Sequence, residues 1–180
     1  MKQIRMPVFL HEVFGEKQSL FGVMMIFAFG GLLTAALLLI YPQSYRDLAV
    51  WRSLLAYLLV FDIFAGCIAN FTASTSNYYS SNKKKRIVFI SIHFHLIVVA
   101  LLLDTSILPS VLVWAYTIAG AFLVNGLRGG QQLLTAGVLL AGGLAWIPML
   151  ECMEPYMLIV SLLFMLKVLF SFSVDHYGSR

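Results

Sequence analysis

The stretch that decides the fold is residues 48–70, LAVWRSLLAYLLVFDIFAGCIAN. It is apolar over a length that can cross a bilayer, because about 17 to 25 helical residues span a hydrocarbon core of roughly 30 Å. Asp62 lies inside it, at a depth where a charge is costly unless it is paired or hydrated. An ionisable residue in such a place predicts either a functional site or a buried polar pair.

The rest of the chain is as apolar as this stretch. Its 180 residues are 61% hydrophobic and only 11% charged, whereas soluble domains carry about 25% charged residues. This composition excludes an ordinary soluble domain and a nucleic-acid partner. We predict an all-α integral membrane protein, a compact bundle of six transmembrane helices between a cytoplasmic or interfacial segment, 1–19, and a cytoplasmic tail, 174–180. The predicted spans are 20–41, 48–70, 87–103, 109–125, 133–150 and 156–173.

The distribution of basic residues predicts the orientation. With a cytoplasmic N-terminus, only Arg46 and Arg52 lie outside, and the positive-inside rule then places both termini in the cytoplasm. We expect the membrane to be a plasma membrane. Three tryptophans are expected at the outer helix ends, where amphipathic rings prefer the headgroup layer: Trp51, Trp114 and Trp146. The basic residues on the inner side are Lys2, Arg5, Lys17, Lys83, Lys84, Lys85, Arg86, Arg128 and Arg180.

Two segments outside the spans carry local signals. Residues 7–17 predict either a short helix on the inner leaflet or an unstructured tail. Residues 72–82 are rich in Ser, Thr, Asn and Tyr and predict a loop. A basic cluster follows that loop and would attract anionic lipid at ~1 kcal/mol per residue, although determination of topology alone also explains it: Lys83, Lys84, Lys85 and Arg86.

Four ionisable residues on three predicted helices share one layer of the membrane. Measured from the inner helix ends at 1.5 Å per residue, Asp62 and His95 are ~12 Å deep, and His93 and Lys167 are ~9 Å deep. Asn70 lies two turns after Asp62 on the same helix stripe. These residues are the candidates for a substrate site or a proton relay, because carboxylate and histidine chains carry protons in pumps and carriers.

Helical phase limits what the two histidines can do together. Residues two positions apart differ by ~200° around a helix, so only one of His93 and His95 can face Asp62 squarely unless the helix unwinds. That placement disfavours a shared metal ion, and it disfavours haem, which would need two opposed axial histidines. We therefore predict no metal site, and the sequence identifies no cofactor.

Plainer interpretations accompany these candidates. Asp62 can form a buried pair that only fixes the helix register, and the long stem of Lys167 can snorkel to the headgroups. Asn125 and Arg128 are candidates for the inner mouth of a pathway, although a glycine-capped helix end with a positive-inside charge also explains them.

Small residues recur at helical spacing and predict tight helix packing. The ridges are Gly31 and Ala35, Ala115 and Ala119, and Gly137, Ala141 and Ala145. In size and helix count the chain loosely resembles the substrate-binding subunits of energy-coupling-factor vitamin importers, and Gly31-x-x-x-Ala35 is similar to the small-residue motif on their first helix. Because such a motif occurs in many membrane helices, the resemblance assigns no family.

Three function classes fit these observations. The first is a small transporter or transporter subunit with a proton-linked Asp/His site. The second is a membrane-embedded, metal-dependent enzyme that acts on lipid, with ligands drawn from Asp62, His93, His95, Asp104 and His176; the different depths of these residues and the lack of a hydrolase motif argue against it. The third is an assembly or immunity factor that packs against another membrane protein or a second copy of itself. No catalytic residue is identified.

Overall fold

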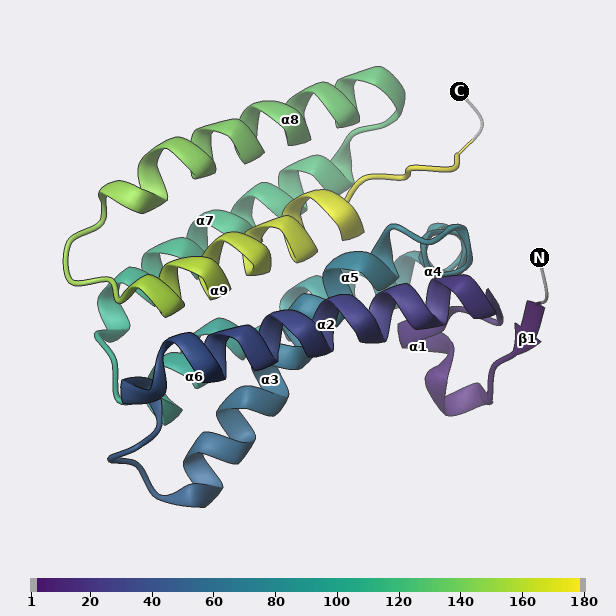
Figure 1. The fold of residues 1–180 in the computed structure, drawn as a ribbon. Coiled ribbons are helices and arrows are strands. Elements are labelled where there is room, and N and C mark those ends of the chain that lie inside the picture. Colours follow the sequence, from purple (N-terminus) through teal and green to yellow (C-terminus); the bar gives the residue numbers. More distant parts are fainter. Residues whose placement is uncertain (1–2, 179–180) are drawn as a thin grey trace.

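The computed structural model of this chain describes residues 3–178 and is all-helical, with 78% of the residues in helices. Within that range six helices are long and apolar enough to cross a membrane, so the predicted all-α class and the number of long apolar helices are confirmed. They run side by side in an elongated bundle that carries both chain ends at one end, which we call the termini end (Figure 1). Lys2 and Arg180, which entered the orientation argument, lie outside the described residues.

Two of the six long helices are divided into two segments. The undivided helices are the first, α2 (Leu20–Ile40), the second, α3 (Val50–Asn70), the fourth, α7 (Ile107–Gly126), and the fifth, α8 (Gly129–Trp146). α8 continues into the short turn η3 (Ile147–Met149). The third consists of α5 (Lys83–Ser91) and α6 (His95–Leu102), and the sixth of α9 (Pro155–Met165) and the π-helical segment η4 (Leu166–Phe172). A short turn, η2 (Pro42–Ser44), connects α2 to α3.

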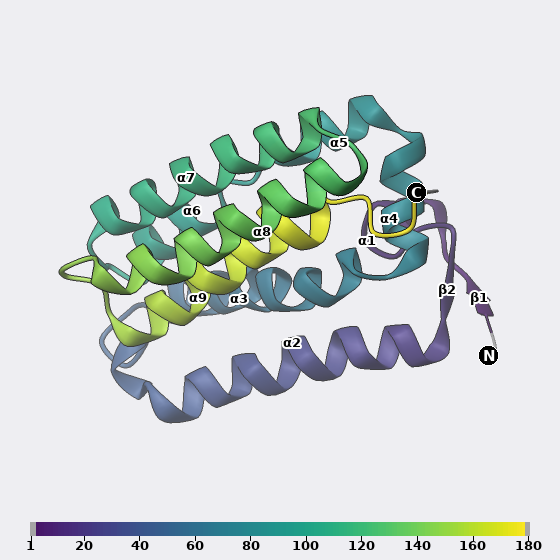
Figure 2. The same ribbon diagram turned by 90° about the horizontal axis from the view of Figure 1, so that it is seen from above.

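The last helix lies at the centre of the bundle. α9 and η4 contact α3, α7 and α8, and α6 packs against α9. In contrast, α2 packs mainly on α3 and lies at one flank of the bundle (Figure 2). Only 17% of the most apolar stretch of α2 is buried, against 61% for the last helix. The flank helix therefore presents most of its apolar side chains outward, as a lipid-facing helix does.

The small-residue ridges do not make the internal contacts that the sequence predicted. Gly30, rather than Gly31, packs against α3, because a Cβ at Gly30 would lie 2.9 Å from the Cβ of Ala65. A Cβ at Gly31 or Gly137 would meet nothing within 4 Å. The exposed alanines on these ridges are Ala35, Ala115, Ala119, Ala141 and Ala145. Helices that are apolar all round give no amphipathic signal of which face is internal, and this is why the prediction was wrong.

The N-terminal segment contains a short helical stretch within the predicted range, over residues 8–14, and adds a pair of strands around it. β1 (Gln3–Arg5) pairs antiparallel with β2 (Lys17–Ser19), and η1 (Val8–Leu10) and α1 (His11–Phe14) lie between them. This small unit packs on α4 (Ala73–Ser81), which occupies most of the segment predicted as a loop. The Thr75 hydroxyl donates to the carbonyl of Val13, and the Tyr79 hydroxyl donates to that of Glu12. Burial raises the pKa of Tyr79.

The basic cluster divides into two parts. Lys83, Lys84 and Lys85 are exposed, and Lys85 pairs with Glu12 at 3.1 Å. Arg86 is buried instead, and its guanidinium donates to the carbonyls of Phe172 and Ser173 at the end of the last helix. Arg86 therefore closes the termini end of the bundle and is not one of the exposed lipid-attracting cations that the sequence predicted.

Candidate functional site

An ion pair between α3 and the last helix forms the centre of the candidate site. Lys167 Nζ lies 2.7 Å from Asp62 Oδ2, and only 4% of the Lys167 side chain is exposed. Asp62 is eight residues from one end of α3 and twelve from the other, so it lies ~12 Å and ~18 Å from the two helix ends. The pair is thus near the middle of the long helices, and the alternative in which Lys167 snorkels outward is wrong.

Gly66 and Asn70 lie on the same stripe of α3 as Asp62 and accommodate the lysine of this pair. Gly66 lies one turn after Asp62, and a Cβ there would lie 2.4 Å from Cε of Lys167. Asn70, one turn further, donates from Nδ2 to the backbone carbonyl of Lys167 at 3.4 Å. The absence of a side chain at Gly66 lets the lysine stem cross α3, and Asn70 holds the backbone from which the stem departs.

Lys167 lies in the π-helical segment, where the wider turn leaves carbonyls without their usual α-helical partners. Side chains satisfy these groups. Ser171 donates to the Lys167 carbonyl at 2.9 Å, and Ser173 donates to the Val168 carbonyl at 2.7 Å. π-helical insertions in α-helices occur frequently at functional sites.

The third long helix is interrupted where its histidines lie. α5 ends at Ser91 and α6 begins at His95, with Ile92–Phe94 between them outside either helix. The ring centroids of His93 and His95 are 5.0 Å apart, so the two rings do not point in opposite directions. The helix unwinds at these residues, which is the exception that the prediction from helical phase allowed, and only one of the two histidines, His95, contacts Asp62. Trp114 on α7 donates from Nε1 to the His93 carbonyl at 2.9 Å and so occupies a backbone acceptor at the break. Trp114 thus lies beside the polar site rather than at a helix end.

Two side chains approach the same oxygen of Asp62. His95 Nδ1 lies 3.4 Å from Asp62 Oδ2, the atom that Lys167 contacts at 2.7 Å. The histidine geometry does not satisfy hydrogen-bond criteria, so the Lys167 contact is the stronger of the two. A protonated His95 and Lys167 would therefore compete for one carboxylate oxygen.

His93 adds an unsatisfied polar atom beside this triad. Its ring packs on Phe89, and its Nδ1 contacts the carbonyl of Phe89, which can only accept, so Nδ1 carries the proton. Nε2 is buried without a hydrogen-bond partner. Such a group is costly unless a water, a proton acceptor or a ligand reaches it.

The carboxylate of Asp62 is not sealed inside the bundle. Its side chain is 47% exposed, and it terminates an exposed stripe on α3 formed by Trp51, Leu55 and Leu58. The lysine of the ion pair is therefore buried, whereas the carboxylate of Asp62 is exposed on the outer surface of the bundle. A half-exposed carboxylate at mid-length of an apolar helix requires water or a polar partner.

The remaining candidates lie elsewhere. Asn125 is the next-to-last residue of α7, and Arg128 precedes α8 at the termini end. Among residues 3–178 neither has a hydrogen bond or ion pair with the polar cluster, which consists of Asp62, His93, His95 and Lys167. Asp104 pairs with Arg52 at 3.6 Å at the opposite end. His176 packs on Phe71 and Phe170, where burial lowers its pKa. Within the described residues no three His, Cys, Asp or Glu side chains are placed to hold a metal ion.

Sequence reasoning missed Gln132, which organises the termini end. Its Nε2 lies 3.2 Å from the carbonyls of Val124, Leu127 and Ser173, and its Oε1 accepts from the Asp175 amide at 2.9 Å. The sequence signal was a glutamine directly before a long apolar run, but the predicted span began one residue later, at residue 133, and so left Gln132 out. Gln132 is 5% exposed and acts as a structural clamp.

No protein-family model matches the chain, and no curated protein or solved structure matches it.

The buried lysine makes a double-mutant cycle informative. We expect Asp62→Asn to destabilise the protein by about 3–5 kcal/mol, because it leaves the Lys167 charge buried without its partner. The double variant Asp62→Asn/Lys167→Met should recover most of this loss, since it removes both charges. The single variant Lys167→Met completes the cycle, and unfolding in detergent measures the free energy of each protein. A loss in the double variant equal to the sum of the two single losses would show that the pair is not coupled.

Proposed function

We propose that this chain is an integral membrane protein with six transmembrane helices, both termini in the cytoplasm, and a plasma membrane as its location. The six apolar helices and the outward-facing apolar side chains of α2 support insertion. The exposed Lys83, Lys84 and Lys85 at the termini end support the orientation, because the positive-inside rule places such clusters in the cytoplasm. The same lysines are the ones we propose to contact anionic lipid.

Within that frame we propose a small transporter, or a transporter subunit, with a proton-linked polar site. The observation that carries this proposal is the shared oxygen: Lys167 and His95 both approach Oδ2 of Asp62 at mid-length of the helices. Histidine is the side chain whose ordinary titration falls between pH 5 and 8. Proton arrival on His95 would therefore change which cation Asp62 binds.

The backbone around the site supports a two-state element. Lys167 departs from a π-helical segment and His95 from the first position after a helix break, so both partners of Asp62 are attached to irregular backbone. Transporter sites commonly use such interrupted helices, because freed backbone groups bind solutes and interrupted helices accommodate movement. The half-exposed side of Asp62 would be the entry for a proton or a cationic solute.

A second candidate is a non-catalytic factor that packs against another membrane protein or a second copy of this chain. One observation favours it: the small residues Ala115, Ala119, Ala141 and Ala145 are exposed, and small residues allow close helix contact. This candidate requires no titration at Asp62, so the experiments on that residue separate the two.

The orientation can be tested with the native cysteines. Cys152 is exposed in the connection before α9, whereas Cys67 is buried with its thiol 3.0 Å from the Leu163 carbonyl. In intact cells a membrane-impermeant maleimide should label Cys152 and leave Cys67 unlabelled. In a Cys152→Ser background, Asn77→Cys on α4 should react only after permeabilisation. The reverse pattern would contradict the proposed orientation.

The proton-linked site predicts charge movement without knowledge of the solute. On a solid-supported membrane, a jump from about pH 8 to about pH 6, which brackets the ordinary histidine range, should give wild-type proteoliposomes a transient current above that of protein-free liposomes.

Asp62→Asn/Lys167→Met should abolish this current, because it removes the carboxylate without leaving an unpaired lysine. Asp47→Asn, an exposed carboxylate in the connection between α2 and α3, should leave it unchanged. A current of wild-type size in the double variant would exclude the Asp62 site.

A further inference from the structure

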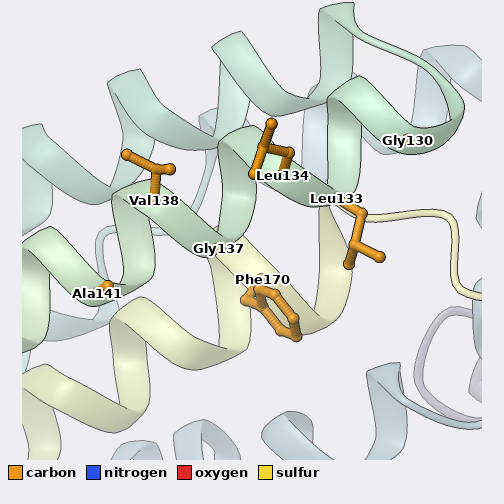
Figure 3. A pocket seen from close by; sticks show the side chains of 7 residues that line it. All are labelled: Gly130, Leu133, Leu134, Gly137, Val138, Ala141 and Phe170. Atoms are coloured by element: carbon orange, nitrogen blue, oxygen red, sulfur yellow. The ribbon is translucent and has the colours of Figure 1, made fainter.

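An apolar groove lies between α8 and the last helix, away from the polar cluster. Its volume is about 570 Å³, within the range of small-molecule sites. Leu133, Leu134 and Val138 project from α8, and Phe170 projects from the last helix beside them (Figure 3). Gly137 and Ala141 contribute little side chain and so leave the space open. None of the polar-cluster residues lines this groove.

The groove begins at a polar, positively charged end. Gly130 lines it and belongs to the first turn of α8, whose N-cap residue is Arg128. No side chain caps this helix, and a Cβ at Gly129 or Gly130 would meet nothing within 4 Å. The first backbone amides of α8 are therefore accessible, and they carry the positive end of the helix dipole. Among the described residues no carboxylate pairs with the exposed Arg128.

We propose that this groove binds one anionic glycerophospholipid, with an acyl chain along α8 and the phosphate at Arg128 and the first amides of α8. Charge complementarity supports the headgroup position, because free helix N-termini and arginine both bind phosphate. This proposal stands apart from the proton-linked function and does not depend on it.

The length of the groove favours an acyl chain over a transmembrane helix. Eleven residue steps separate Gly130 from Ala141, which is ~16 Å along α8 at 1.5 Å per residue. That is about half of the ~30 Å hydrocarbon core and so matches one leaflet. A docked helix would use the full thickness, whereas one acyl chain uses half. The groove thus has the length of a chain and a cationic end for its phosphate.

Native mass spectrometry of the full chain in detergent, titrated with dioleoyl phosphatidylglycerol or dioleoyl phosphatidylcholine, tests the proposal. Wild-type protein should retain one phosphatidylglycerol in preference to phosphatidylcholine. Gly137→Leu should abolish this retention, because the new side chain fills the groove, and its Cβ meets no protein atom within 4 Å. The control Gly31→Leu, at an equally open glycine on α2, should behave as wild type. Equal retention in the two leucine variants would overturn the proposal.

Arg128→Gln tests the headgroup contact. It should weaken phosphatidylglycerol retention about fivefold, the effect of one basic residue near an anionic lipid, and leave phosphatidylcholine unchanged. Arg46→Gln, an exposed arginine at the opposite end, is the matched control and should have no effect. An equal loss in both arginine variants would show general charge attraction and overturn the assigned headgroup position.

A cross-linking measurement on the wild-type chain avoids reliance on variants. Phosphatidylglycerol with a diazirine in its acyl chain should label peptides that contain Leu134 and Val138 more strongly than those of α2. Uniform labelling over all exposed apolar helices would show ordinary annular lipid and overturn the proposal. Cross-links from the groove to a second copy of the chain would assign it to self-association instead.

Discussion

The ion pair between Lys167 and Asp62 is the interaction on which the rest of the structure depends. A lysine that is 4% exposed at mid-length of an apolar bundle cannot remain charged without a counter-ion. The pair fixes the rotation of the last helix against α3, requires a glycine at position 66, and places Asn70 on the adjacent carbonyl. The π-helical segment and the serines that satisfy it follow from directing this stem toward α3.

The long helices could be predicted from sequence because hydropathy and length are properties of each segment alone. The positions of Asp62, His93, His95 and Lys167 along their helices were also predictable, since position follows from counting residues. Their contacts were not. The break at residues 92–94 and the π-helical segment depend on hydrogen bonds that hydropathy does not encode. Trp114 donates to the His93 carbonyl from another helix, and Ser171 donates to the Lys167 carbonyl within the same segment. Ideal helical phase therefore did not show that the helix unwinds between His93 and His95, and snorkelling misplaced Lys167.

Which face of each helix packs inside the bundle was harder to predict than the position of the helix in the sequence. An apolar helix in a membrane has no polar side to mark its exterior, so Gly31 and Gly137 read as internal contacts although they lie on open surface. The resemblance to vitamin-importer subunits rested partly on the Gly31 motif and gains no support from comparison with known proteins. Two features of the outer surface are explained by their chemistry. One is the half-exposed carboxylate of Asp62 on α3, and the other is the apolar groove between α8 and the last helix, which has a cationic end.

The central claim is that Asp62, His95 and Lys167 form a hydrated, titrating site rather than a dry structural pair. The most direct measurement is the protonation of His93 and His95 in reconstituted, ¹⁵N-histidine-labelled protein, followed by solid-state NMR with and without Asp62→Asn. The account predicts that His95 changes protonation state between about pH 5 and 8, the ordinary histidine range, and that Asp62→Asn changes the midpoint of that transition. A protein in which neither histidine titrates in that range, with spectra unaltered by the substitution, would contradict it.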